Sequence, residues 1–456
     1  MKTAALNNKD ILSHKLRFEA EHYLNDNSFL CLALERNKDN CDTLENLATV
    51  FNPPVFKRQF CKPTSRSVQY FQSSDVQNAE EFSPVHIFKG QAESLNLLVN
   101  KGDVLVTGFG TIGNTRLVSK HQDGVCYANN VCRIRTNSNI PNGFIYAFMT
   151  SKYGYAQLNN NASGSVVRYI EAPGIKRTLV PRVSESFQKE VDELIQESAR
   201  LREEATEALE EAKSIIFDFC CLPFSKNERK NINSLSLKNI INSFNTRLDP
   251  PIYINDGVKW VKGLKVTTKR LGDCKVKLWY PGMFKRVYVN NGLPYIKGSS
   301  LFVSNPFRSC EKLSRSKTPD IDELWLNEGM ILISCAGACG QVKMITKEYN
   351  DKNAIGSPDI IRLVSSDELF TKEYLFAYLQ IPPIYDYMQS LKYGSVIERF
   401  DTYNIENVPI VEPTKQLSER ITSIIRYYMD CTYRAFNCEE KAISMVEEEI
   451  EKWNKN

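Results

Sequence analysis

Two apolar stripes, separated by a constant 230 positions, constrain the fold of this 456-residue chain more than any other feature. Each stripe advances by alternating steps of four and three residues, with charged residues between its members. This spacing matches the a and d positions of a heptad, which are typical of helices that pack along their length. The helix-packing residues predicted from it are Phe187, Val191, Leu194 and Leu201 in the first stripe, and Leu417, Ile421, Ile424 and Tyr428 in the second.

Both stripes are narrow and include alanines and cysteines. The alternative to a helix pair is two amphipathic helices on separate cores, which usually present a wider apolar face. We therefore expect the two helices to pack closely on each other.

Further landmarks repeat in the same order at nearly the same offset, which indicates an internal duplication. Phe56-Lys57-Arg58 is matched by Phe284-Lys285-Arg286, and residues 101–113, 164–166 and 179–183 are matched by 327–340, 394–396 and 407–411. The sequence between these landmarks is almost unrelated. We predict a first domain over residues 1–184, a helix over 185–219, a linker and second domain over 220–416, and a second helix over 417–456.

The charge of the chain alternates along these four segments. Their net charges are +6, −7, +7 and −2 in chain order, although the whole chain carries only +4. Basic domains suit a polyanionic partner, whereas the acidic segments coincide with the predicted helices.

Residues Gly108–Gly113 satisfy the GxGxxG pattern of dinucleotide-binding loops. That pattern requires a helix beginning at the glycines, because the helix N-terminus holds the pyrophosphate. The residues that follow show no helical period, and the second copy, Cys335–Gly340, lacks the first glycine. We therefore predict a tight strand–turn–strand at both places.

Two short segments, Asn52–Val55 and Asp249–Ile252, suggest the loop with which DNA amino-methyltransferases hold a target amino group. In that loop the fourth position stacks an aromatic ring on the flipped base, but here it is Val55 or Ile252. The prolines are not shared between the two copies, and no glycine-rich methyl-donor site precedes them. We therefore nominate no catalytic residue and predict a chain that is not an enzyme.

The cysteine and histidine content argues against a metal site. Thirteen cysteines include no CxxC pair, and the chain has four histidines. We expect no metal and reduced thiols in a cytoplasmic protein. No apolar run approaches the roughly 18 residues of a membrane-spanning helix, so we expect no membrane partner.

Two similar basic domains joined by long helices suit a ligand with two similar but distinct sites. A helix of about 33 residues spans about 50 Å, and DNA repeats every 34 Å or so. We interpret the chain as a molecular ruler on double-stranded DNA.

The segments GDVLVTGFGTIG (102–113), GSVVRYI (164–170) and VPRVSESFQKEVDELI (180–195), with their second copies, resemble the specificity subunit of a type I restriction-modification system. The resemblance covers nearly the whole chain. It implies an α+β fold with two tandem target-recognition domains, each followed by a long helix. It also implies that the two helices pack as an antiparallel coiled coil, and that each domain reads one half of a bipartite, asymmetric DNA site.

The resemblance further implies partners. Two methyltransferase subunits dock on such a chain, and two restriction (translocase-nuclease) subunits join for cleavage. S-adenosylmethionine and ATP with magnesium then belong to the partner subunits, and this chain binds no cofactor of its own.

Candidate DNA contacts follow from the landmarks that both copies share. They are Lys57, Arg58, Ser73, Ser74, Asn114, Arg116, Ser165 and Arg168 in the first half, and Lys285, Arg286, Lys297, Ser299, Gln341, Lys343, Ser395 and Arg399 in the second. Two alternatives remain. A stand-alone DNA adenine methyltransferase would transfer methyl groups without a partner, and a coiled-coil scaffold would not bind duplexes in a salt-dependent way.

Overall fold

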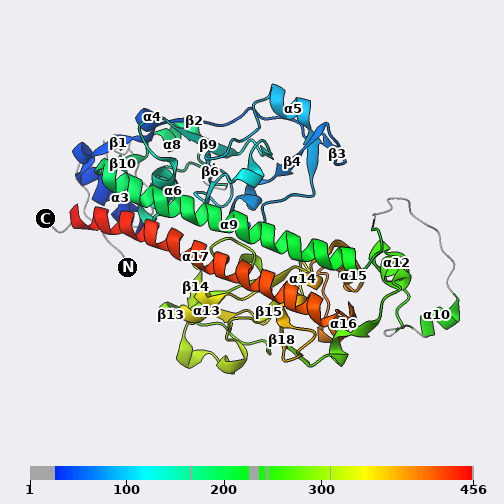
Figure 1. The fold of residues 1–456 in the computed structure, drawn as a ribbon. Coiled ribbons are helices and arrows are strands. Elements are labelled where there is room, and N and C mark those ends of the chain that lie inside the picture. The colour runs from blue at the N-terminus through cyan, green and yellow to red at the C-terminus, as the bar shows by residue number, and fades with distance from the viewer. Residues whose placement is uncertain are drawn as a thin grey trace. The chain divides into compact units, whose positions relative to one another are not determined.

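The computed structural model describes residues 26–164, 167–224, 236–241, 243, 246–308 and 310–453 (Figure 1). They form two compact units. The first contains the described residues up to Glu203 together with those from Arg434 onward, and the second contains those from Glu204 to Tyr433. Each long helix, α9 (Glu185–Phe219) and α17 (Lys415–Trp453), contributes residues to both units.

The first unit contains two four-stranded sheets and one short strand pair. The antiparallel sheet has the order β2 (Ala48–Phe51), β9 (Val131–Thr136), β6 (Val104–Thr107), β7 (Thr115–Leu117). The second sheet has the order β3 (Phe60–Cys61), β5 (His86–Phe88), β4 (Ser67–Phe71), β8 (Cys126–Tyr127), in which β4 and β8 run parallel. Strand β1 (Cys41–Thr43) pairs with β10 (Leu179–Pro181). The α-helices besides α9 are α3 (Asp26–Arg36), α4 (Leu44–Leu47), α5 (Lys89–Ser94), α6 (Asn142–Thr150), α7 (Lys152–Asn160) and α8 (Ala172–Lys176).

The second unit repeats this plan with one strand fewer among its described residues. Its antiparallel sheet has the order β12 (Val276–Trp279), β18 (Ile360–Ser365), β15 (Ile331–Ser334), β16 (Val342–Met344). Its other sheet has the order β14 (Glu311–Leu313), β13 (Tyr288–Ile296), β17 (Ile355–Gly356), with β13 and β17 parallel. Strand β11 (Thr268–Arg270) pairs with β19 (Pro409–Val411). The α-helices besides α17 are α10 (Leu237–Ile241), α11 (Pro251–Ile254), α12 (Asp256–Gly263), α13 (Lys347–Asp351), α14 (Lys372–Tyr378), α15 (Pro382–Ser390) and α16 (Thr402–Glu406).

In each unit, the strand that precedes the glycine turn lies in the core. Every residue of β6 and of β15 is buried, which explains why these segments read as continuous apolar runs. Each strand continues through a tight turn into its antiparallel neighbour, β7 or β16. The prediction of strand–turn–strand at both places is therefore confirmed.

The long helices pack antiparallel within each unit. In the first unit Arg434 lies 3.6 Å from Glu197. In the second unit the Tyr427 hydroxyl donates to Glu204 at 2.7 Å, and Arg420 lies 3.4 Å from Glu211. The positions on α9 rise by seven while those on α17 fall by seven, as antiparallel heptads require. The predicted α+β fold with an antiparallel coiled coil is confirmed.

The buried face of these helices is wider than the predicted seam. Val191, Leu201, Leu417 and Ile421 are buried as expected, and Phe187 packs at the edge of the first core. Leu194, Ile424 and Tyr428, however, are only partly buried, and the following residues Ile195, Ile425 and Met429 take the interior. The reason is that each helix also covers the core of a globular domain, which adds a third buried position to each heptad.

No helix among the described residues is long and apolar enough to cross a membrane. None of the thirteen cysteines is in a disulfide bond.

Candidate nucleic-acid interface

Several stretches of the chain contain basic residues and no acidic ones, and two of them lie at matching places of the duplication. Basic segment 1, which we define as residues 46–74, contains Lys57, Arg58, Lys62 and Arg66. Basic segment 2, residues 274–310, contains Lys275, Lys277, Lys285, Arg286, Lys297 and Arg308. The two segments occupy matching places in the duplication. This absence of carboxylates is a sequence signal that a landmark comparison alone misses, and it is the pattern expected of a surface that faces phosphates.

The basic segments connect the two sheets of each unit. Segment 1 includes β2, β3 and β4, and segment 2 includes β12 and β13. Large apolar side chains are exposed on both: Val55 and Phe60 on segment 1, and Tyr280, Met283 and Tyr288 on segment 2. Exposed aromatic and basic side chains on one surface are typical of nucleic-acid contacts.

An arginine lies on a tyrosine at the same place in both units. Arg58 Nε donates to the Tyr70 hydroxyl at 2.6 Å, and its guanidinium carbon is 5.7 Å from the ring centroid. Arg286 makes the same contacts with Tyr295, at 2.7 and 5.7 Å. Burial raises the pKa of Tyr70 and Arg58 opposes that rise, so the phenol stays neutral at physiological pH. The stack holds each guanidinium in one orientation.

The lysine before each of these arginines is exposed. Lys57 and Lys285 make no ion pair within the described part of the chain. Arg286 lies 3.8 Å from Asp359, and Lys297 pairs with Glu311 across the β13–β14 hairpin. Lys57 and Lys285 are therefore predicted contacts whose charge no described carboxylate compensates.

The predicted serines lie at the ends of central strands. Ser73 and Ser74 begin a short 3₁₀ turn after β4, and the Ser74 hydroxyl donates to Asp75 at 3.4 Å. Ser299 lies in the equivalent turn after β13 and is exposed. The turn with Ser73 and Ser74 begins at the end of basic segment 1, and the turn with Ser299 lies inside basic segment 2. These hydroxyls therefore adjoin the basic surface of their own unit.

The residues predicted just past the glycine turns are held by the protein itself. Asn114 and Gln341 use their backbone N–H groups to close the turns. Arg116 Nε donates to Gln122 at 2.7 Å, its Nη1 donates to the Asn78 carbonyl at 2.6 Å, and Glu81 lies 3.7 Å away. Lys343, on β16, lies 5.7 Å from the Tyr349 ring centroid. Arg116 is therefore placed to fix the fold, because strand pairing turns it toward internal acceptors.

Residues 163–170 and 393–400, which we call the GS loops, contain the remaining predicted contacts. Ser165 lies outside the described residues. Ser395 and Arg399 are exposed, and Arg168 is exposed while donating to the Asn159 carbonyl. The two loops can be aligned by their backbone hydrogen bonds. Tyr169 bonds to Ser163 as Arg399 bonds to Tyr393, so Tyr169 matches Arg399. Arg168 and Arg399 are thus not equivalent, which corrects the pairing suggested by the sequence.

Each glycine turn is shaped by the hydroxyl of a side chain that the sequence analysis did not single out. Thr107 Oγ1 donates to the Thr111 carbonyl at 2.5 Å and accepts from Asn114 N–H at 3.0 Å. Ser334 does the same with the Ala338 carbonyl at 2.6 Å and Gln341 N–H at 3.0 Å. Gly110 and Gly337 have φ of 74° and 72°, a region that favours glycine. The second turn therefore keeps its shape although Cys335 replaces Gly108.

Each unit contains a completely buried arginine on a strand of its antiparallel sheet. Arg133, on β9, donates to the carbonyls of Leu97, Tyr127, Ala128 and Val131. Its counterpart Arg362, on β18, donates to the carbonyls of Gly356, Ser357 and Ile360. Burial lowers the pKa of each arginine to about 10, so both are charged at neutral pH. Sequence reasoning missed this pair because a buried arginine without a carboxylate partner is rare.

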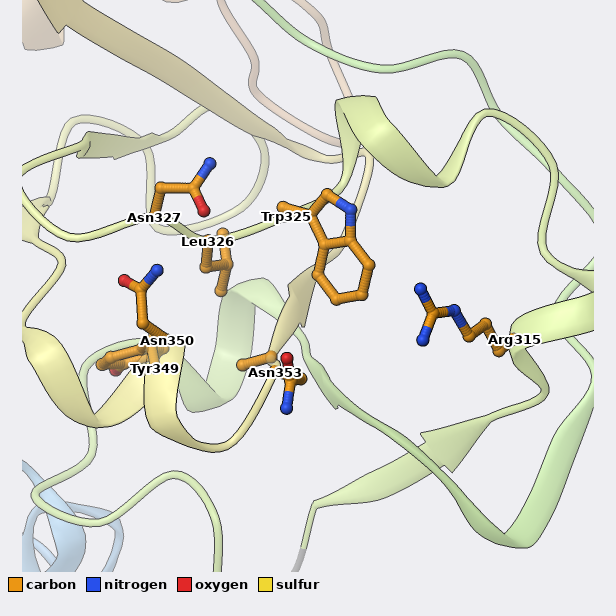
Figure 2. A pocket seen from close by; sticks show the side chains of 8 residues that line it. Arg315, Trp325, Leu326, Asn327, Tyr349, Asn350 and Asn353 are labelled. Atoms are coloured by element: carbon orange, nitrogen blue, oxygen red, sulfur yellow. The ribbon is translucent and has the colours of Figure 1, made fainter.

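The second unit also has a pocket of about 240 Å³. Figure 2 shows the Arg315 guanidinium directed toward the indole of Trp325, and Asn350 and Asn353 also line the pocket. The guanidinium carbon of Arg315 is 5.8 Å from the indole centroid. Such a pocket offers a stacking surface and amide groups. Among the described residues no cluster of histidine, cysteine and carboxylate side chains could hold a metal ion.

Comparison with known proteins identifies a domain in the second half of the chain. Residues 269–437 match the model of the type I restriction modification DNA specificity domain. No curated protein sequence matches the chain. Among solved structures, a type I restriction-modification S subunit from M. genitalium aligns with 12% identity over 91% of this chain and 95% of that one, with a TM-score of 0.36. The HsdS subunit from Thermoanaerobacter tengcongensis aligns with 15% identity over 91% and 95%, with a TM-score of 0.28.

The matched residues run from β11 into α17 and include basic segment 2, the second glycine turn and the second GS loop. The same elements recur in the first unit in the same order. The match identifies residues 269–437 as similar to a type I restriction modification DNA specificity domain.

Proposed function

We propose that the two units read two different half-sites of one bipartite DNA sequence. The observation that carries the proposal is the repetition of an acid-free basic segment with an arginine held on a tyrosine, Arg58 on Tyr70 and Arg286 on Tyr295. Phosphate contacts by such residues position a protein on the duplex, and side chains that differ between the halves supply the discrimination among bases.

The side chains that differ between the units support the recognition of two different half-sites. The Trp325 pocket is lined by Arg315, Trp325 and three asparagines. At the matching place of the Trp325–Leu326–Asn327 run, the first unit has Leu98, Val99 and Asn100. A shared frame with unlike side chains is what two unlike half-sites require.

The chain acts, in this proposal, without catalysis and within a larger complex. Residues 269–437 match a DNA specificity domain, and methyl transfer and cleavage would belong to two methyltransferase subunits and two restriction subunits. S-adenosylmethionine and ATP with magnesium would be bound by those partners. The antiparallel helices would set the unread gap between the half-sites, because a helix pair keeps a fixed length per residue.

Selection from random duplexes tests the proposal. The full-length chain, alone and with its methyltransferase, is incubated with a randomised duplex library at two salt concentrations, and the retained sequences are read. We expect a bipartite motif with a constant gap. The Lys57→Ala/Arg58→Ala variant should weaken binding to every duplex, and Lys189→Ala, on an exposed helix face, should not.

Three outcomes would contradict the proposal. Retention of a single uninterrupted motif would exclude two half-sites. Methyl transfer by the purified chain alone would favour a stand-alone adenine methyltransferase. The absence of salt-dependent retention on any duplex would favour a scaffold without DNA.

A further inference from the structure

The tips of both GS loops expose apolar side chains. Val167 is 61% exposed in the first loop, and Val396 and Ile397 are 93% and 60% exposed in the second. Val167 and Ile397 occupy the same position when the loops are matched by their hydrogen bonds. The exposure is therefore a feature that both halves share, although the sequence around it has diverged.

The loops are held in shape by the protein itself. In the first loop Ser163 and Tyr169 exchange two backbone hydrogen bonds of 2.8 Å, and the Tyr169 ring stacks on Phe109 with centroids 5.5 Å apart. In the second, Tyr393 and Arg399 exchange bonds of 2.8 and 2.9 Å. Backbone hydrogen bonds thus close the base of each loop, which lowers the entropic cost of inserting Val167 or Ile397 into a partner.

A glycine at the same place in each loop permits this shape. Gly164 and Gly394 have φ of 94° and 105°. A Cβ added to Gly164 would lie 2.3 Å from the Val167 carbonyl oxygen, and one added to Gly394 would lie 2.5 Å from that of Ile397. The backbone thus folds tightly under each apolar tip.

Both loops adjoin the basic segments. Asn52, in basic segment 1, accepts a hydrogen bond of 2.8 Å from the backbone N–H of Ala172, two residues beyond the first loop. Tyr280, in basic segment 2, lies near Tyr393, whose pKa is raised by burial and by Asp401, with a smaller contribution from Tyr280. An arginine also follows each tip, Arg168 or Arg399.

We propose that each GS loop inserts its apolar tip between base steps of the DNA, with the neighbouring arginine in the groove. The first loop would insert Val167, and the second would insert Ile397 and Val396. Proteins that kink DNA combine arginine in a groove with apolar wedges of this kind. DNA is favoured over a protein partner because the loops adjoin the acid-free basic segments, and the carboxylate in the second tip, Glu398, is paired with Lys392. The proposal rests on the proposed function and adds that the duplex is unstacked once in each half-site.

The test uses the selected duplex with 2-aminopurine placed at successive positions, since the fluorescence of this base rises when it is unstacked. With the full-length chain we expect a several-fold rise at one step in each half-site. Val167→Ser should abolish the rise in the first half-site only, and the Val396→Ser/Ile397→Ser double variant should abolish it in the second only. Both variants should bind about tenfold more weakly with an unchanged salt slope, because no charge is removed.

Matched controls are Phe29→Ser in the first unit and Leu248→Ser in the second, which remove exposed apolar side chains elsewhere. Both controls should leave the fluorescence rise intact. If the wild-type chain binds the duplex with no rise at any position, the wedge is excluded while the proposed function stands. If the tip variants keep the rise but lose co-purification with the methyltransferase, the loops dock a protein and our proposal is wrong. Failure to bind any duplex would remove the proposed function itself.

Discussion

The guanidinium of Arg58 lies against the ring of Tyr70 and donates its Nε–H to the hydroxyl at 2.6 Å. Twelve positions separate the two residues, and the intervening chain holds β3 and the turn before β4. The same relationship between Arg286 and Tyr295 spans nine positions, and the intervening chain lies mostly in β13. The contact has therefore been kept while the connection has changed, which indicates that the orientation of the arginine is what matters.

Removing the basic pair of one half should weaken DNA binding without changing which bases are preferred. For Lys57→Ala/Arg58→Ala we expect the salt dependence of binding to fall by about one to two units of slope, since each phosphate contact contributes about 0.9. Fluorescence anisotropy titrations between low and physiological salt measure this slope. Lys189→Ala/Arg200→Ala, which removes two exposed helix charges, is the control. An unchanged slope in the first variant would mean that the pair does not face phosphates.

The buried arginine of β9 should be essential for stability. Arg133→Met leaves four carbonyl oxygens without their donor, so we expect the free energy of unfolding to fall by about 2–4 kcal/mol. Urea denaturation followed by circular dichroism measures it. Arg66→Met, at an exposed position, should change the free energy by less than about 0.5 kcal/mol. A loss for Arg133→Met no larger than this control would contradict the role assigned to the carbonyl cage.

Heptad spacing and glycine patterns predicted much of the fold, because both are local. The sequence predicted α9 with the bounds that it has, and α17 within two residues of its start at Lys415. The third buried position, at Ile195 and Ile425, was not predictable from the seam because it depends on what the globular domains place against the helices.

The candidate site was predicted less fully. Matching landmarks pointed to Lys57, Arg58, Lys285 and Arg286, which are near neighbours in sequence. They did not show that Arg116 folds back onto Glu81, because that contact joins residues 35 positions apart. Nor did they locate Arg133 and Arg362, whose partners are backbone carbonyls that carry no sequence signal.

A matched insertion in both helices should change the spacing of the DNA site. Seven residues added between Glu203 and Glu204, and seven between Tyr433 and Arg434, preserve the heptad phase and add about 10 Å of helix. We expect a bipartite motif whose gap is longer by about three base pairs, given 3.4 Å or so per pair. Selection from random duplexes reads the gap. Seven residues inserted at the exposed Ser138 turn serve as the control, and an unaltered gap in the helix variant would exclude the helices as the ruler.

Alkaline pH should destabilise the second unit. Burial raises the pKa of Tyr349, Tyr374 and Tyr378 well above the usual value near 10. The folded state keeps these protons while the unfolded chain loses them, so their contribution is full below pH 10 and declines above it. Each such tyrosine adds about 1.4 kcal/mol per pH unit to the slope. Denaturation at pH 9, 10 and 11 should show a shallower decline for Tyr374→Phe than for the wild type, and an equal decline would contradict the assignment.

The exposed Cys221 and the buried cysteines should differ strongly in thiol reactivity. Burial raises the pKa of Cys31, Cys126, Cys132 and Cys220 to about 12, so almost no thiolate is present at pH 8. Cys221 is exposed. In a reaction with a chromogenic disulfide we expect Cys221 to react in a fast phase and these four to react only after denaturation. Cys221→Ser should remove that fast component, and its persistence would show that another thiol is reactive.

The sharing of α17 between the units bears on how the protein is made. Val446 and Ile450 lie in the same buried cluster as Phe144 and Val191, which the ribosome synthesises about 250 to 300 residues earlier. During synthesis one side of the core of the first unit therefore stays uncovered until α17 has been translated. A nonsense mutation after Tyr433 would thus damage the half of the protein encoded first, while every residue of the second unit would already have been made.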